Sequence, residues 1–138
     1  MRIMKIIFTS LFILIAGWAA AGTTDEATES KPPKNCLSLM SIDDLDIIDN
    51  QNIAFRMNNG DYYLNHLPNT CPMLDRYRVI MYKTPLSSLC SLDIINVLDP
   101  IGGGLQYYGS CGLGKFNPVS KEEIQQMKDQ VKEKKTTK

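Results

Sequence analysis

Residues 52–67 read NIAFRMNNGDYYLNHL, and this stretch predicts a β-hairpin. Polar and apolar side chains alternate at its start, which places Ile53, Phe55 and Met57 on one face of a strand. Asn59-Gly60 is expected at the centre of a two-residue turn, because both residue types tolerate a positive φ angle. The returning strand completes the pair, so the sequence predicts antiparallel β-structure here.

Short runs rich in β-branched and aromatic residues continue on both sides of this hairpin, separated by turn residues. The predicted strands are residues 46–49, 78–84, 93–98 and 113–119, and residues 85–91 are expected to form a turn or a short helical turn. The fold class predicted is mainly β, as a small antiparallel meander or a curled, barrel-like sheet with two disulfides and one C-terminal helix.

The helix is predicted to begin after Ser120, which is a favourable N-cap residue with Glu123 three positions later. This spacing allows a capping box, in which each side chain binds the backbone N–H of the other residue. Ile124, Met127 and Val131 form an apolar stripe at helical spacing. The stripe is short, so the sequence leaves open whether the helix docks on the sheet or stands free.

The first 21 residues are typical of a signal peptide. Arg2 and Lys5 precede an uncharged apolar run over residues 6–18, and Ala19, Ala20 and Ala21 supply a cleavage site before Gly22. The run is shorter than the roughly 20 residues that span a bilayer, so no membrane span is expected after cleavage, and an uncleaved membrane anchor is the alternative. The predicted organisation is a signal peptide (1–21), a flexible leader (22–35), a stapled β domain (36–119) and a C-terminal helix with a basic tail (120–138).

Composition places the chain among ordinary globular proteins, with 43% hydrophobic and 22% charged residues in 138 positions. Loss of Arg2 and Lys5 with the signal peptide leaves 13 basic and 15 acidic residues. The mildly acidic domain lacks the basic patch that phosphate contacts require, which argues against a nucleic-acid partner.

Four cysteines, Cys36, Cys71, Cys90 and Cys111, all follow the signal peptide. An even number of cysteines in an exported domain predicts disulfides, and four of them allow three pairings. The favoured pairing is Cys36–Cys71 with Cys90–Cys111, because each pair then brackets a predicted hairpin. No Cys-x-x-Cys spacing supports a redox role, and a zinc site would need closely spaced cysteine pairs and more than the single histidine. No metal or cofactor is therefore predicted.

A candidate binding loop follows the strand at residues 93–98. Gly102, Gly103 and Gly104 fit no phosphate-binding motif and are interpreted as a mobile loop. Tyr107 and Tyr108 stand beside it, and tyrosines are enriched at binding surfaces. A peptide or ligand loop is the functional alternative to simple hydrophobic filling.

Two further clusters carry weaker functional hypotheses. His66 is the only candidate general base, but no nucleophile is fixed beside it, so no catalytic residue is assigned. Asp43, Asp44, Asp46 and Asp49 lack the order and the glycine of a calcium loop and are expected to form a solvated turn.

Several phrases occur together in an order that resembles a family of small exported proteobacterial proteins catalogued as a domain of unknown function. They are DNQNI at 49–53, YYLN at 62–65, CPML at 71–74, LCSLD at 89–93, VLD at 97–99 and SCGLG at 110–114. The resemblance covers about Cys36 to Val119 and implies a periplasmic or envelope setting in a Gram-negative bacterium. It implies no activity, cofactor or catalytic residue.

Together these patterns predict an exported, periplasmic, non-enzymatic domain that binds a protein or an envelope component. Two alternatives remain. One is a secreted hydrolase inhibitor that presents the loop of residues 102–109, and the other is a hydrolase that uses His66.

Overall fold

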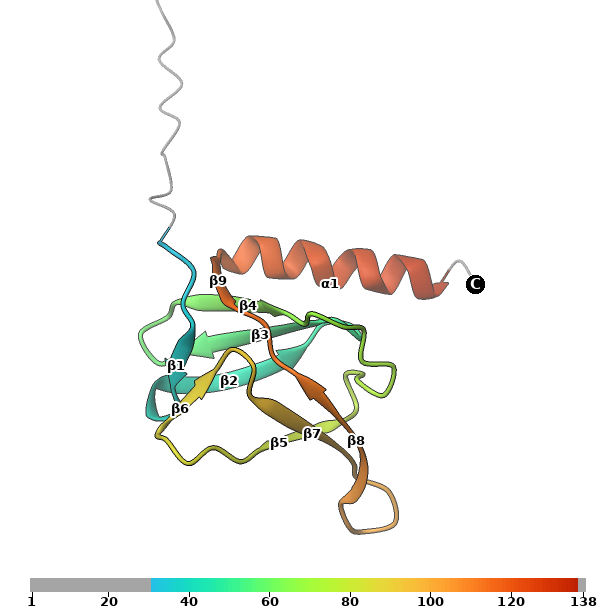
Figure 1. Ribbon diagram of the computed structural model, residues 1–138. Helices are drawn as coiled ribbons and strands as arrows, with labels where there is room; N and C mark the ends of the chain where they lie inside the picture. The colour runs from blue at the N-terminus through green and yellow to red at the C-terminus, as the bar shows by residue number, and fades with distance from the viewer. Residues whose placement is uncertain (1–30, 137–138) are drawn as a thin grey trace, which may run out of the picture.

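A computed structural model describes residues 31–136 of the chain (Figure 1). The predicted signal peptide and residues 22–30 of the predicted leader lie outside this range. The elements, in chain order, are β1 (Cys36–Ser38), the 3-10 turn η1 (Leu39–Ser41), β2 (Ile42–Ile47), β3 (Asn52–Met57), β4 (Tyr62–His66), β5 (Val79–Tyr82), β6 (Ser88–Cys90), β7 (Ile94–Asp99), β8 (Gln106–Gly112), β9 (Phe116–Val119) and α1 (Lys121–Thr136).

These strands form three antiparallel sheets. The largest has the order β2-β3-β4-β9, a second has the order β5-β7-β8, and β1 pairs with β6 in a short ribbon. Every pairing between strands is antiparallel. The prediction of a mainly β, antiparallel fold with two disulfides and a C-terminal helix is therefore confirmed, and the described strands do not close into a barrel.

The predicted hairpin is strands β3 and β4, and its register pairs Phe55 with Tyr63. Its turn differs from the expected one. Gly60 donates its N–H to the Met57 carbonyl, the Met57 N–H is bonded to the Asp61 carbonyl, and only Gly60 has a positive φ angle, of 87°. Asn58 and Asn59 therefore occupy the turn, and Gly60 takes the left-handed position after it.

The main core lies between the two larger sheets and includes the face predicted for β3. Ile53 and Phe55 are completely buried, and the ring of Phe55 meets that of Phe116 edge-on with centroids 5.4 Å apart. Tyr63 and Val97 contribute from β4 and β7. Burial of such side chains typically stabilises a fold by about 1.5–3 kcal/mol each.

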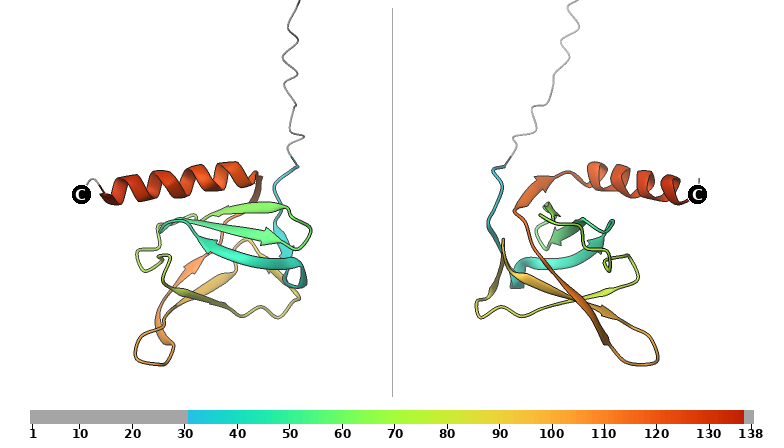
Figure 2. Two further views of the ribbon diagram at one scale, coloured as in Figure 1. Left: turned by 180° about the vertical axis from the view of Figure 1, so that it is seen from behind. Right: turned by 45° about the vertical axis from the view of Figure 1, so that its right-hand side comes forward.

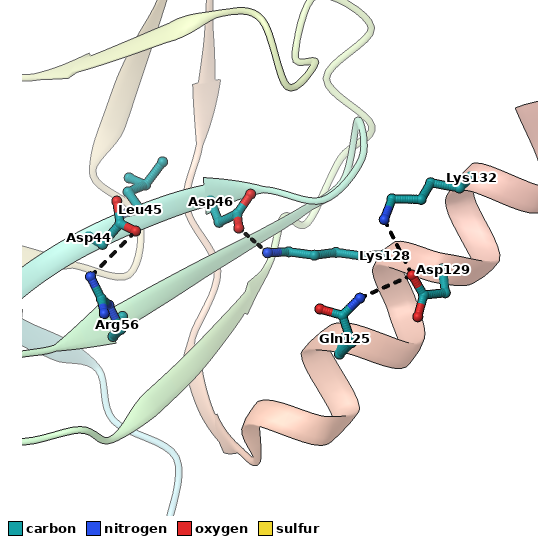
Figure 3. A network of polar contacts seen from close by, with 8 residues as sticks. All are labelled: Asp44, Leu45, Asp46, Arg56, Gln125, Lys128, Asp129 and Lys132. Carbon is teal, nitrogen blue, oxygen red and sulfur yellow. Dashed lines mark hydrogen bonds and ion pairs between the residues drawn. The ribbon is translucent and has the colours of Figure 1, made fainter.

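Helix α1 docks on the outer face of the four-stranded sheet (Figure 1). Ile124 is buried against Ile48 and Ala54, with Met127 and Val131 packed beside them. Lys128 forms an ion pair with Asp46 of β2 (Figure 3). The predicted apolar stripe is thus the face by which the helix docks. The sequence left open whether the helix docks or stands free, and in the structure it docks on the sheet.

The capping box at the start of α1 is confirmed. The Ser120 N–H donates to Glu123 Oε2 at 2.6 Å, and the Glu123 N–H donates to Ser120 Oγ at 3.1 Å. Val119 precedes the cap and packs in the same small cluster as Ile124. These contacts fix where the helix begins and how it approaches the sheet.

The predicted disulfide pairing is wrong. The bonds are Cys36–Cys90 and Cys71–Cys111. The first joins directly opposed residues of β1 and β6, and the second ties the segment after β4 to β8 of the other sheet. Each bond therefore connects segments that are adjacent in space and distant in sequence, so neither encloses a single hairpin.

Four segments differ from the predicted elements, and the first is residues 85–91, expected as a turn or a short helical turn, where Ser88–Cys90 form strand β6. Of the four acidic residues expected in a solvated turn, Asp43, Asp44 and Asp46 lie in β2, where Asp43 pairs with Arg56 at 2.8 Å, and only Asp49 lies in the turn that follows. The glycine-containing stretch expected as loop is strand β8 over residues 106–112. Lys34, placed in the flexible leader, exchanges two backbone hydrogen bonds with Phe116, so the chain joins the fold before Cys36.

Candidate functional site

The predicted binding loop is the end of the hairpin formed by β7 and β8, which projects beyond the body of the molecule in every view (Figures 1 and 2). We call residues 100–105, between the two strands, the hairpin tip. Gly102 and Gly103 turn the chain there with φ angles of 72° and 80°. The space around both α-carbons is open, so the tip is held only by the strands beneath it.

Two large apolar side chains of the tip face solvent. Ile101 is 66% exposed and Leu105 is 59% exposed. The three residues between them are glycines, which have no side chain, so nothing else at the tip covers Ile101 and Leu105. Sequence reasoning missed both residues because it concentrated on the glycines and tyrosines beside them.

Tyr107 and Tyr108 do not lie in the loop; they belong to β8, at an irregularity in its pairing with β7. Val97 pairs with Gly109 and Leu98 with Tyr107, so Tyr108 is the additional residue of a β-bulge. The two side chains consequently have different neighbours. The Tyr107 hydroxyl lies 3.0 Å from Ser110 Oγ, whereas the Tyr108 ring stacks on the guanidinium of Arg78.

A charged pair anchors the base of this hairpin. Arg78 precedes β5 and forms an ion pair with Asp99, the nearly buried last residue of β7. The hydrogen bond from Arg78 to Asp99 raises the pKa of the guanidinium, so Arg78 stays charged. Because the Tyr108 ring covers Arg78 at 4.4 Å, β5, β7 and β8 are tied together directly below the tip. The sequence gives no local signal for this long-range pair.

Strands β7 and β8 belong to the three-stranded sheet, and one face of this sheet is open. Helix α1 does not cover it, because α1 docks on the four-stranded sheet. The residues that register on this face are Val79 and Met81 of β5, Ile94, Asn96 and Leu98 of β7, and Tyr107 and Ser110 of β8, and of these Leu98 is buried. We call them the open face. Ser110 Oγ donates to Asn96 Oδ1 at 2.6 Å in its middle, while Val79, Met81 and Ile94 are exposed.

His66 lies elsewhere, at the end of β4. Its Nδ1 is 2.8 Å from Asn52 Oδ1 of the paired strand, and Asn52 Nδ2 donates to both carboxylate oxygens of Asp49. Because the amide oxygen of Asn52 can only accept, Nδ1 of His66 carries the proton. All four cysteines are in disulfides, so none is available as a nucleophile beside it. In this arrangement His66 is the cross-strand hydrogen-bond partner of Asn52. The hypothesis of a hydrolase that uses His66 stays a prediction.

A groove of about 620 Å³ opens at the start of α1, between the β3–β4 turn and the helix. Lys31 Nζ donates to both carboxylate oxygens of Asp61 at 2.8 Å across its edge, which lowers the pKa of Asp61 and raises that of Lys31. The buried hydroxyl of Tyr63, which also lines the groove, has no hydrogen-bond partner within residues 31–136. Lys121 and Glu123 balance each other in charge, so the groove favours neither cations nor anions.

Residues 31–136 contain no group of three or more histidine, cysteine, aspartate or glutamate side chains placed to hold a metal ion. Within the same part of the chain, the one helix lacks the length and apolar character that crossing a membrane would need.

Comparison with known proteins gives one positive result. The family described as "Family of unknown function (DUF6491)" matches residues 1–135, a longer range than the Cys36–Val119 resemblance found in the sequence. The leader and most of α1, which were placed outside the resemblance, thus belong to the matched region. No curated protein and no solved structure matches the chain.

Proposed function

The chain belongs to the family of unknown function DUF6491, and we propose that it is an exported, non-enzymatic binding domain that engages a component of the bacterial envelope. The binding surface is the hairpin tip together with the open face. The periplasm of a Gram-negative bacterium is the proposed compartment.

Export is supported by two independent features. Residues 1–21 have the charge and apolar pattern of a signal peptide. All four cysteines form disulfides, which persist in oxidising compartments such as the periplasm. A domain of this size has a limited core, and the two bonds supplement it.

One observation carries the binding proposal. Ile101 and Leu105 are both more than half exposed at the end of a projecting hairpin whose base is fixed by Arg78 and Asp99. A fold gains nothing by holding two large apolar side chains in water on a rigid support, and such exposed apolar groups typically mark interaction sites. Because the base is anchored, the loss of conformational freedom on binding is confined to residues 100–105.

The test is co-sedimentation of the purified chain, from Gly22 onward, with envelope membranes that retain their proteins. Every contact described above lies within residues 31–136, so this form keeps the complete fold. The variant Ile101→Asp/Leu105→Asp places two charges at the tip. The matched control is Met40→Asp, which alters an apolar side chain that is 86% exposed in η1, away from the hairpin.

We expect the unchanged chain and the Met40→Asp variant to sediment with the membranes, and the double variant to remain in the supernatant. The three proteins should unfold at the same denaturant concentration, because all three positions are exposed. Equal sedimentation of the double variant and the control would refute the proposed surface. Absence of sedimentation for the unchanged chain would refute the proposed envelope function itself.

A further inference from the structure

We propose that the component engaged by the hairpin tip is the surface of a lipid bilayer, into which Ile101 and Leu105 insert. The inference rests on the proposed function, because it names the partner of the same surface. It extends that function by assigning the tip to lipid and not to an envelope protein.

The charge distribution carries the first step. No charged residue occurs from Pro100 to Gly114, a stretch that includes the whole tip and all of β8. Charged side chains are costly inside a bilayer, so an inserted segment has to be free of them. Within this stretch the exposed side chains at the end are the apolar Ile101 and Leu105, and three glycines between them add no polar group.

The residues behind the tip supply the second step. Tyr107 is 66% exposed in β8, and Tyr77 is exposed next to Arg78 at the base of the hairpin. Tyrosine prefers the headgroup level of a membrane. Behind the tip, Gln106 is opposite Asp99 and Tyr107 is opposite Leu98, so an exposed aromatic ring stands two residues behind Leu105.

The shape of the site favours lipid over a protein partner. A stable protein interface buries roughly 800 Å² on each side, and it usually places its anchors in pockets. The tip is instead a narrow, convex turn that projects from the sheet (Figure 2). A fluid bilayer accommodates such a turn without a complementary pocket. The Arg78–Asp99 pair lies directly behind the tip, where Asp99 is opposite Gln106, and it is largely buried and already neutralised.

Tryptophan fluorescence provides a direct test, because the single tryptophan of the chain, Trp18, is absent from the form that begins at Gly22. Leu105→Trp then introduces a unique reporter at the tip, and Met40→Trp is the matched reporter outside it. Each protein is mixed with protein-free phosphatidylcholine vesicles, with and without an anionic lipid. Vesicles carrying bromine on the acyl chains measure whether the reporter reaches the hydrocarbon. The form without residues 1–21 is necessary, since the apolar run of residues 6–18 would itself partition into lipid.

We expect the emission of Leu105→Trp to shift to shorter wavelength and to be quenched by brominated chains, while Met40→Trp changes neither property. Adding Ile101→Asp to Leu105→Trp should weaken vesicle binding about tenfold or more, because a charge replaces a buried apolar group. Raising the salt concentration should leave binding to neutral vesicles intact.

If Leu105→Trp shows no shift with vesicles while the chain still sediments with envelope membranes, the lipid inference is overturned and a protein component is the partner. Equal quenching of both reporters also overturns it, because binding would not depend on the tip. If the chain binds neither preparation, the proposed function fails together with this inference.

Discussion

Replacing Gly114 with alanine should destabilise the domain strongly, because this glycine lies where the chain crosses from one sheet to the other. A Cβ at residue 114 would overlap the backbone carbonyl oxygen of His66 and lie 3.3 Å from its carbonyl carbon. Since the obstacle is backbone, no side-chain rotation can relieve it. The segment would have to move away from Asn65, which is completely buried and binds Gly114 twice.

The magnitude follows from these contacts. Asn65 Nδ2 donates to the Gly114 carbonyl and the Gly114 N–H donates to Asn65 Oδ1, both at 2.8 Å. Two such bonds contribute about 1–3 kcal/mol net, and forcing an additional carbon into a packed site costs about 1–3 kcal/mol. Gly114→Ala should therefore lower the free energy of unfolding by about 2–6 kcal/mol, a large part of the 5–15 kcal/mol typical of a domain.

Urea unfolding measures this change, with Gly112→Ala as the control. Gly112 is also at the end of β8, but no atom lies within 4 Å of the position that its Cβ would take, and its φ angle is not positive. Its substitution should change the free energy by no more than about 0.5 kcal/mol. Equal effects of the two substitutions would refute the argument from close approach.

Three other predictions concern the disulfides, the helix and one carboxylate. Non-reducing peptide mapping should recover the Cys71–Cys111 bond, and replacing both residues by serine should cost about 4 kcal/mol in urea unfolding, since the bond closes a separation of 40 residues. Ser120→Ala should cost about 1 kcal/mol in the same assay, because it removes the cap of α1. NMR titration should find the pKa of Asp61 below its ordinary value. The stabilisation from its pair with Lys31 is therefore present above the ordinary pKa and is lost as the pH falls through the lowered pKa. Lys31→Ala should raise the titration midpoint of Asp61.

The parts of the fold that were predictable from sequence have short-range signals. Asn-Asn-Gly determines the β3–β4 hairpin, and Ser120 with Glu123 determines where the helix begins. Both involve residues within a few positions of each other. The disulfide pairing has no such signal, because it depends on how β1 meets β6 and how the chain after β4 meets β8.

Strands β2 and β8 were mispredicted because partners remote in sequence compensate their unfavourable composition. Lys128 of α1 pairs with Asp46 of β2, at a position that by itself indicates a solvated turn. In β8, the Met73 side chain packs where a Cβ of residue 109 would lie. For the candidate site, the tyrosines and glycines were found from composition, whereas Ile101 and Leu105 became evident only with their exposure.

The most direct test of the binding account is hydrogen–deuterium exchange of the chain from Gly22 onward, with and without envelope membranes. The backbone of the hairpin tip is exposed and should exchange rapidly in the free protein. Binding as proposed should slow exchange at residues 101–108 and leave the groove between Asp61 and Lys121 unchanged. Protection that appears at this groove, with the tip exchanging as in the free protein, would contradict the account.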